Sequence, residues 1–153
     1  MSNSLPMPQT LVWRGDPQGH LDLLDQTRLP SCEKVLEIQD LSALIEAIQM
    51  LRVRGAPAIG VAAGYGAVLA IRESRDLADL ASNLRALEAA RPTAVNLAWA
   101  VDRIRKRITE LGSQCTIEDM KAPILREAIA IHEEDKALCD AMGRHGADLI
   151  QDG

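Results

Sequence analysis

An arginine followed by glycine and proline stands directly before a long run of small and aliphatic residues. Proline fits the first turn of a helix because its missing N–H would have no partner there. A helix that starts at this point directs its free backbone N–H groups and its positive end toward one spot, which suits a phosphate or another anion. The segment is Val53-Arg54-Gly55-Ala56-Pro57-Ala58-Ile59-Gly60. Its local chemistry equally fits a surface arginine at a helix end.

A second arginine stands at another helix junction. Arg91 precedes Pro92, and the residue before a proline is pushed out of helical geometry. Taken alone, Arg91 is a solvated loop residue. A guanidinium nevertheless offers a planar fork of donors that pairs two phosphate oxygens at once.

The glycines of this region do not indicate a nucleotide-binding loop. Gly55 and Gly60 have the spacing G-x-x-x-x-G, but Val61-Ala62 stands where Lys followed by Ser or Thr is required. No side chain there would reach a terminal phosphate or hold a magnesium ion, which excludes a P-loop NTPase. We interpret Gly60, Gly64 and Gly66 as positions that allow another helix to pack closely.

Histidines and cysteines give no strong sign of a metal or a nucleophile. His132 begins an acidic stretch similar to a zinc-binding helix, but Lys136 stands where the second histidine belongs. Cys32, Cys115 and Cys139 are odd in number and form no CxxC pair. Without a secretory signal this pattern indicates a reducing cytoplasm, and we interpret the cysteines as idle thiols.

Composition limits the partners and the core. The chain has 153 residues, 47% of them hydrophobic, with no Phe and one Tyr, so Leu, Ile, Val, Ala and Met must form the core. A net charge of -5 argues against nucleic acid and anionic membranes, which need a basic face. The apolar run from Gly55 to Ile71 is shorter than the ~20 residues of a membrane span.

Hydrophobic periodicity predicts an α+β fold that is mostly α, in which a small N-terminal antiparallel sheet precedes a helical bundle. We divide the chain into residues 1–112, the sheet and helices, and residues 113–153, a long helix and linker. Asp40 is expected to cap the first helix, Thr116 and Asp119 to form a capping box, and Trp99 to lie in the core. The expected strands are 10–13, 21–25 and 34–38, and the expected helices are 41–51, 57–72, 77–90, 92–111 and one beginning near 116.

Four segments of the sequence resemble a known family. They are Leu23-Leu24-Asp25-Gln26, Val53 to Gly60, Arg91-Pro92-Thr93-Ala94-Val95-Asn96-Leu97-Ala98-Trp99, and Gly143-Arg144-His145-Gly146-Ala147. The chain is similar to the N-terminal part of the 5-methylthioribose-1-phosphate isomerases, in the initiation factor 2B alpha/beta/delta-like family. The resemblance covers nearly all of this chain and less than half of such an enzyme.

The resemblance implies a role for particular residues. Arg54, Gly55 and Ala56 match residues that contact the sugar phosphate, and Arg91 matches a second arginine that contacts the substrate. The implied reaction converts 5-methylthioribose 1-phosphate to 5-methylthioribulose 1-phosphate in methionine salvage, with no cofactor or metal. The family's acid–base cysteine and aspartate belong to a Rossmann-like second domain that is absent from this sequence, so we expect no catalytic residue here and an inactive fragment.

Two alternatives remain open. One is an isomerase of the same superfamily that acts on ribose 1,5-bisphosphate. The other is a regulatory or scaffold subunit, similar to the initiation-factor relatives, that binds a sugar phosphate without turnover. In all three cases the expected partner is a small sugar phosphate in the cytoplasm, and the family resemblance implies a homodimer for the complete protein.

Overall fold

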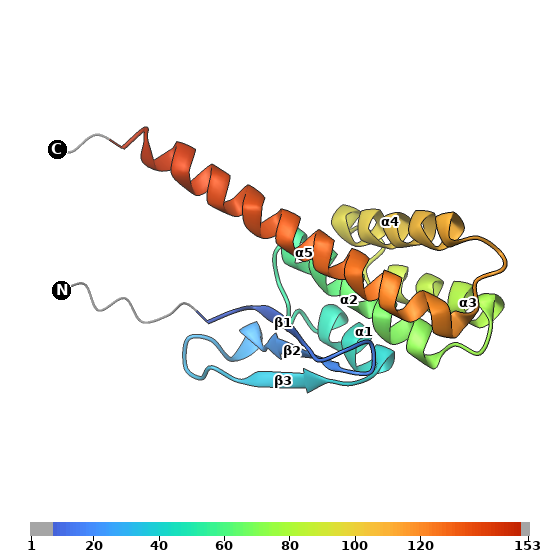
Figure 1. The fold of residues 1–153 in the computed structure, drawn as a ribbon. Coiled ribbons are helices and arrows are strands. Elements are labelled where there is room, and N and C mark those ends of the chain that lie inside the picture. Colours follow the sequence, from blue (N-terminus) through green and yellow to red (C-terminus); the bar gives the residue numbers. More distant parts are fainter. Residues whose placement is uncertain (1–7, 151–153) are drawn as a thin grey trace.

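The expected fold class is confirmed. A computed structural model describes residues 8–150, and within that range a three-stranded antiparallel sheet precedes a bundle of five α-helices (Figure 1). The sheet has the order β1-β2-β3, and a short 3-10 helix, η1, follows β2. The elements are β1 (Leu11–Arg14), β2 (His20–Leu24), η1 (Gln26–Arg28), β3 (Val35–Ile38), α1 (Leu41–Gln49), α2 (Ala56–Glu73), α3 (Leu77–Glu88), α4 (Val95–Leu111) and α5 (Ile117–Ala147).

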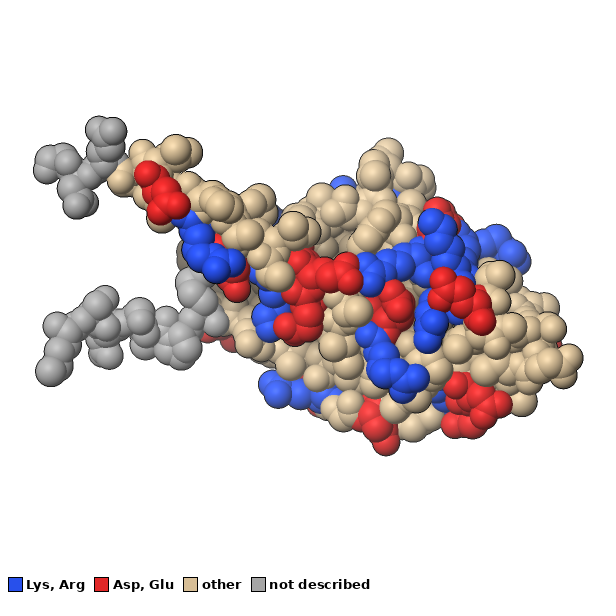
Figure 2. Space-filling view, turned by 45° about the horizontal axis from the view of Figure 1, so that its top comes forward, with Lys and Arg blue, Asp and Glu red and all other residues tan. Residues whose placement is uncertain are grey.

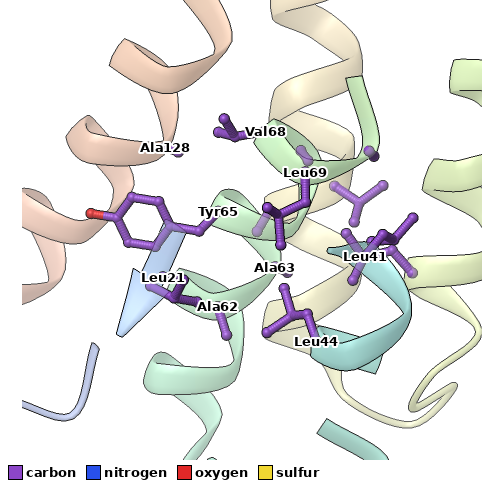
Figure 3. Close-up of a cluster of buried hydrophobic side chains, with 14 of the residues drawn as sticks. Leu21, Leu41, Leu44, Ala62, Ala63, Tyr65, Val68, Leu69 and Ala128 are labelled. Carbon is purple, nitrogen blue, oxygen red and sulfur yellow. The ribbon is translucent and has the colours of Figure 1, made fainter. Parts of the chain in front are cut away.

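Helix α2 is the centre of the fold. Every residue from Ile59 to Ile71 is buried, because the other four helices and the sheet surround it (Figures 1 and 3). The glycines of α2 permit this packing, as expected. A Cβ at Gly66 would lie 2.8 Å from a methyl group of Leu44, and one at Gly60 would lie 3.1 Å from the carbonyl oxygen of Asn96.

Most predicted boundaries agree with the structure to within one or two residues, but α4 begins later than expected. Residues between Arg91 and Ala94 form a turn, closed by a hydrogen bond of 2.9 Å from the Ala94 amide to the Arg91 carbonyl. Helix α5 begins at Ile117, close to its expected start near residue 116, and continues through Pro123.

The expectation that Trp99 lies in the core is wrong. Its side chain is 50% exposed, and the Arg103 guanidinium carbon lies 5.6 Å from the ring centre. Trp99 follows Leu97 by two residues, which is ~200° around the helix. Because Leu97 faces the core, the helical phase turns Trp99 away from it.

The two halves of α5 have different environments. The first half packs on α2 and α4 in the common core, through side chains such as Ile124 and Ala128. The second half extends beyond the bundle (Figures 1 and 2), and Leu138 and Met142 are exposed on it. The division predicted at residue 112 stays a prediction. No helix within residues 8–150 has the length and apolar content to cross a bilayer.

Candidate functional site

The helices start at two opposite ends of the bundle (Figure 1). Helices α2 and α4 start together at one end, the near end, since Gly60 in the second turn of α2 touches Asn96 in the first turn of α4. Helix α1 starts at the opposite end, the far end, where the Leu41 amide donates a hydrogen bond of 2.8 Å to Glu73 in the last turn of α2. Helices α3 and α5 start at that end too.

Each of the three helices at the far end has a side-chain cap. The Asp40 carboxylate accepts from the Ala43 amide at 2.8 Å, and Asp76 accepts from the Asp79 amide at 2.8 Å. At the start of α5, Thr116 and Asp119 form the expected capping box. Each cap accepts one amide of the first turn, and the carboxylates of Asp40 and Asp76 place a negative charge at the start of α1 and of α3.

The two helices at the near end have no side-chain cap. Gly55 precedes α2 with φ of 92°, a backbone conformation that favours glycine, and open space surrounds the position where its side chain would be. Ala94 precedes α4. Among residues 8–150, the first amides of both helices donate to no protein acceptor. The amides in question belong to Ala56 and Ala58 in α2 and to Val95 and Asn96 in α4.

The four residues expected to bind substrate lie at this near end. Arg54 and Gly55 lead into α2, Ala56 begins it, and Arg91 opens the turn before α4. Arg54 is exposed, and its Nε donates to the Leu51 carbonyl at 3.1 Å. Arg91 is half-buried. Within the described part of the chain neither guanidinium forms an ion pair, so their positive charges are not neutralised by this fold. Their contact with substrate stays a prediction.

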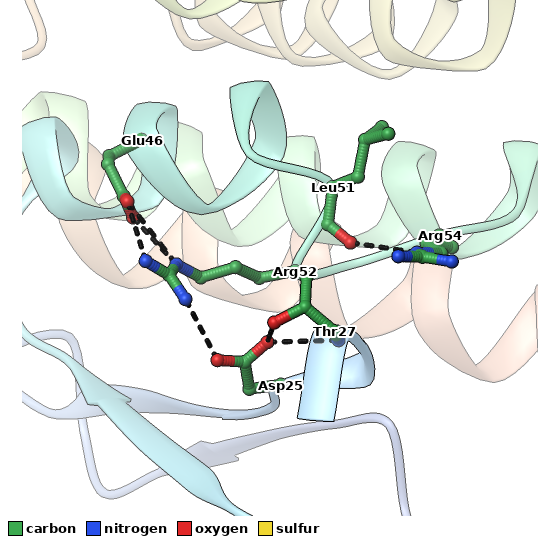
Figure 4. Close-up of polar contacts among 6 residues, drawn as sticks. All are labelled: Asp25, Thr27, Glu46, Leu51, Arg52 and Arg54. Atoms are coloured by element: carbon green, nitrogen blue, oxygen red, sulfur yellow. Dashed lines mark hydrogen bonds and ion pairs between the residues drawn. The ribbon is translucent and has the colours of Figure 1, made fainter. Parts of the chain in front are cut away.

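An ion-pair network that the sequence did not predict lies beside Arg54. The guanidinium of Arg52 lies 2.9 Å from Asp25 and 2.8 Å from Glu46 (Figure 4). Asp25 is only 1% exposed and also accepts from the Thr27 hydroxyl at 2.6 Å. That hydroxyl, the Thr27 amide and the Arg52 guanidinium hold the pKa of Asp25 below its usual range, although burial acts in the opposite direction.

A cavity of about 150 Å³ lies beside the near end. Its lining comes from the first turns of α2, from α4 and from α5, and includes Pro57, Gly60, Trp99 and Leu138. Neither Arg54 nor Arg91 is among its lining residues. The acidic Glu134 and Asp135 also line the cavity. It therefore lies next to the helix starts but is not the anion site itself.

His132 is held by a hydrogen bond that the sequence did not predict. Its Nδ1 lies 2.8 Å from the Tyr65 hydroxyl, and the Tyr65 ring stacks on Trp13 at 5.5 Å. Burial lowers the pKa of His132, as does the Lys136 charge, and burial raises the pKa of Tyr65 to about 12. Across residues 8–150, no cluster of three His, Cys, Asp or Glu side chains has the arrangement of a metal site.

The chain is similar to curated isomerases over almost its whole length. It is 42% identical over 144 residues to the methylthioribose-1-phosphate isomerase of Methylocella silvestris, covering 94% of this chain and 38% of that protein. It is 39% identical over 148 residues to the 5-deoxyribose 1-phosphate isomerase of Moorella thermoacetica, covering 93% and 41%. The chain thus spans about two fifths of the length of the curated relatives it matches.

Two solved structures share the fold. The 5-methylthioribose 1-phosphate isomerase of Pyrococcus horikoshii superposes with a TM-score of 0.86 at 34% identity, covering 97% of this chain and 42% of that one. The delta subunit of translation initiation factor 2B from A. fulgidus superposes with a TM-score of 0.78 at 38% identity, covering 95% and 42%. The initiation factor 2 subunit family model matches residues 52–153. The chain therefore belongs to the initiation factor 2 subunit family.

Proposed function

We propose that this chain is the substrate-phosphate-binding part of an aldose–ketose isomerase that converts 5-methylthioribose 1-phosphate to 5-methylthioribulose 1-phosphate. The observation that carries the proposal is the near end of the bundle. There two helices begin without side-chain caps, and each is preceded by an arginine without an ion pair in the described residues. All four features attract an anion.

The electrostatics of this end suit a doubly charged phosphate. Each helix start carries a partial positive charge of about half a unit, and an anion there gains ~0.3–2 kcal/mol depending on its burial. A hydrogen bond to a charged group contributes a further ~1.5–3 kcal/mol. The protein as a whole is acidic, and acidic and basic side chains are interspersed on the face that Figure 2 shows. The attraction must therefore come from local groups.

The chemistry of the substrate explains why the phosphate must be held. The phosphate is attached to C1, so the sugar ring cannot open freely. Isomerisation moves a hydrogen from C2 to C1, which requires an oriented substrate and a site closed to water. This chain orients C1 through its phosphate, and the acid–base groups come from elsewhere in the complete protein. We therefore expect the 153-residue chain to bind the substrate without converting it.

The names of the relatives support the choice of ligand. One acts on methylthioribose 1-phosphate and another on 5-deoxyribose 1-phosphate. The two sugars differ at C5 and share the ribose 1-phosphate. A segment that matches both relatives at about 40% identity is suited to bind the part that the sugars share.

The proposal is tested by calorimetric titration of the chain with 5-methylthioribose 1-phosphate. Arg54→Ala and Arg91→Ala should each weaken binding by about tenfold or more, since each removes a charged hydrogen bond. Arg75→Ala is the matched control, because Arg75 is an exposed arginine at the far end, paired with Asp79. Equal affinity for the wild type and both near-end variants would remove the phosphate site from this surface.

A second candidate function is a regulatory subunit that binds a sugar phosphate without turnover. The similarity to the initiation factor delta subunit favours it. The complete protein separates the two functions, because the isomerase converts 5-methylthioribose 1-phosphate and the regulatory subunit only binds it. Ribose 1,5-bisphosphate belongs in the same assay, since a preference for it would indicate a second basic group near the sugar's other end.

A further inference from the structure

The connector between α1 and α2 carries two arginines that point in opposite directions. Arg52 extends back toward α1 and the sheet, whereas Arg54 lies on the other side of the connector, near the start of α2 (Figure 4). Val53 between them is fully buried. The short segment thus has one side chain in an ion-pair network, one in the core and one at the candidate anion site.

The backbone around Arg52 is held as firmly as its side chain. Its amide donates to the Ala47 carbonyl at 2.9 Å, and its carbonyl accepts from the Gln26 amide at 2.8 Å. Its guanidinium joins Asp25 to Glu46. Arg52 therefore connects the end of β2, helix α1 and the connector at a single point, two residues before Arg54.

The backbone of Leu51 is a second feature of the connector that fixes the position of Arg54. Its φ of 57° places it in the left-handed region, which is unfavourable by ~1–2 kcal/mol for a residue with a side chain. Such strain persists only where the surrounding structure imposes it. The Leu51 carbonyl accepts the hydrogen bond from the Arg54 Nε at 3.1 Å, so the unusual backbone orients the group that holds Arg54.

Stability alone does not account for the network. A buried ion pair can often be replaced by apolar residues of similar size without loss of stability, whereas removal of one partner leaves an uncompensated charge. The ion pairs do fix the position of the connector, because a guanidinium held between two carboxylates has a defined geometry. We propose that Asp25, Arg52 and Glu46 are positioning residues that present Arg54 to the substrate phosphate. This inference rests on the proposed function.

The test is a double-mutant cycle on the 153-residue chain, read by NMR titration with inorganic phosphate. Asp25→Asn should weaken phosphate binding by about tenfold in the wild-type background, a change of ~1.4 kcal/mol. In the Arg54→Ala background it should have almost no further effect, because a positioning residue acts through the group it positions. A tenfold loss in both backgrounds, or in neither, would overturn the inference.

Arg52→Lys keeps the experiment decisive if Asp25→Asn does not fold. Lysine retains the positive charge next to Asp25 but cannot bridge two carboxylates as a planar fork does. We expect a weaker phosphate affinity that Arg54→Ala again masks, and full affinity in Arg52→Lys would contradict the inference. Arg54→Ala alone reports on the proposed function: if it leaves phosphate binding unchanged, the site itself is wrong, and the positioning role falls with it.

Discussion

The helices at the two ends of the bundle differ in how their first backbone amides are satisfied. At the far end, the side chains of Asp40, Asp76 and Thr116 each accept one amide in the first turn of α1, α3 and α5. At the near end, α2 and α4 begin at Gly55 and Ala94, which offer no cap. Free amides are unfavourable for folding unless water or a ligand satisfies them. We therefore propose that the near end is the one that binds an anion.

The same contrast appears between neighbouring arginines. Arg52 is neutralised by Asp25 and Glu46, while Arg54, two residues later, has only the Leu51 carbonyl as a described partner. Proximity in sequence therefore says little about the role of a positive charge. The acidic groups around it decide whether it stabilises the fold or remains free for a ligand.

The largest expected effect concerns the two arginines in the complete enzyme. Arg54→Ala should lower kcat/KM for 5-methylthioribose 1-phosphate by ~10- to 150-fold, the range for loss of one charged hydrogen bond. Arg91→Ala should act similarly. Steady-state kinetics check both variants beside Arg75→Ala at the far end, and an unchanged kcat/KM would show that Arg54 is outside the site.

A cap added at the near end should stabilise the fold and weaken phosphate binding. Ala94→Asp supplies a carboxylate that can accept the first amides of α4, which should raise the free energy of unfolding by ~0.5–2 kcal/mol. The same carboxylate should repel phosphate and weaken its binding. Ala94→Ser is the matched control, since it caps without charge. Urea unfolding and phosphate titration measure the two effects. A stabilised Ala94→Asp with undiminished phosphate affinity would show that the uncapped start of α4 does not bind phosphate.

A cap removed at the far end should do the reverse. Thr116→Ala should lower the free energy of unfolding by ~0.5–2 kcal/mol, because the start of α5 loses its side-chain acceptor. Phosphate affinity should stay at the wild-type value, since this end is remote from Arg54. Urea unfolding provides the first number and calorimetry the second. A loss of phosphate binding in Thr116→Ala would mean that the two ends are not independent.

The smallest effect concerns acid. The folded pKa of Asp25 lies below the unfolded value of 3.8 because Thr27 and Arg52 bind the ionised carboxylate. The resulting stability is present above the unfolded pKa and is lost as pH falls through the folded pKa. Urea unfolding between pH 6 and pH 3 should show a steeper decline for the wild type than for Asp25→Asn. Parallel curves would remove Asp25 from the network.

Local signals in the sequence were sufficient for the fold but not for the network. Asp40 and the Thr116–Asp119 box are read within four residues, so their caps could be predicted. The Gly55–Pro57 pattern likewise marked the start of α2. Arg52 and Asp25 lie 27 residues apart in the sequence, and only the folded chain brings them together.

Trp99 and the helix directions show the other limits of the sequence. An aromatic residue suggested the core, but its phase on α4 placed it half outside. The shared near end of α2 and α4 depends on how successive helices reverse, which no local pattern specifies. The family resemblance therefore named the candidate residues and implied their contact with one substrate, while the helix arrangement that brings them to one end could not be predicted from local patterns.

Whether the near end binds an anion is measured by an amide NMR titration of the 153-residue chain with inorganic phosphate. We predict that the largest shifts occur at the uncapped starts of α2 and α4, at Ala56, Ala58, Val95 and Asn96. The amides that follow the caps, those of Ala43 and Asp79, should scarcely move. Equal shifts at both ends, or none at the near end, would contradict the claim that the fold leaves one end open for an anion.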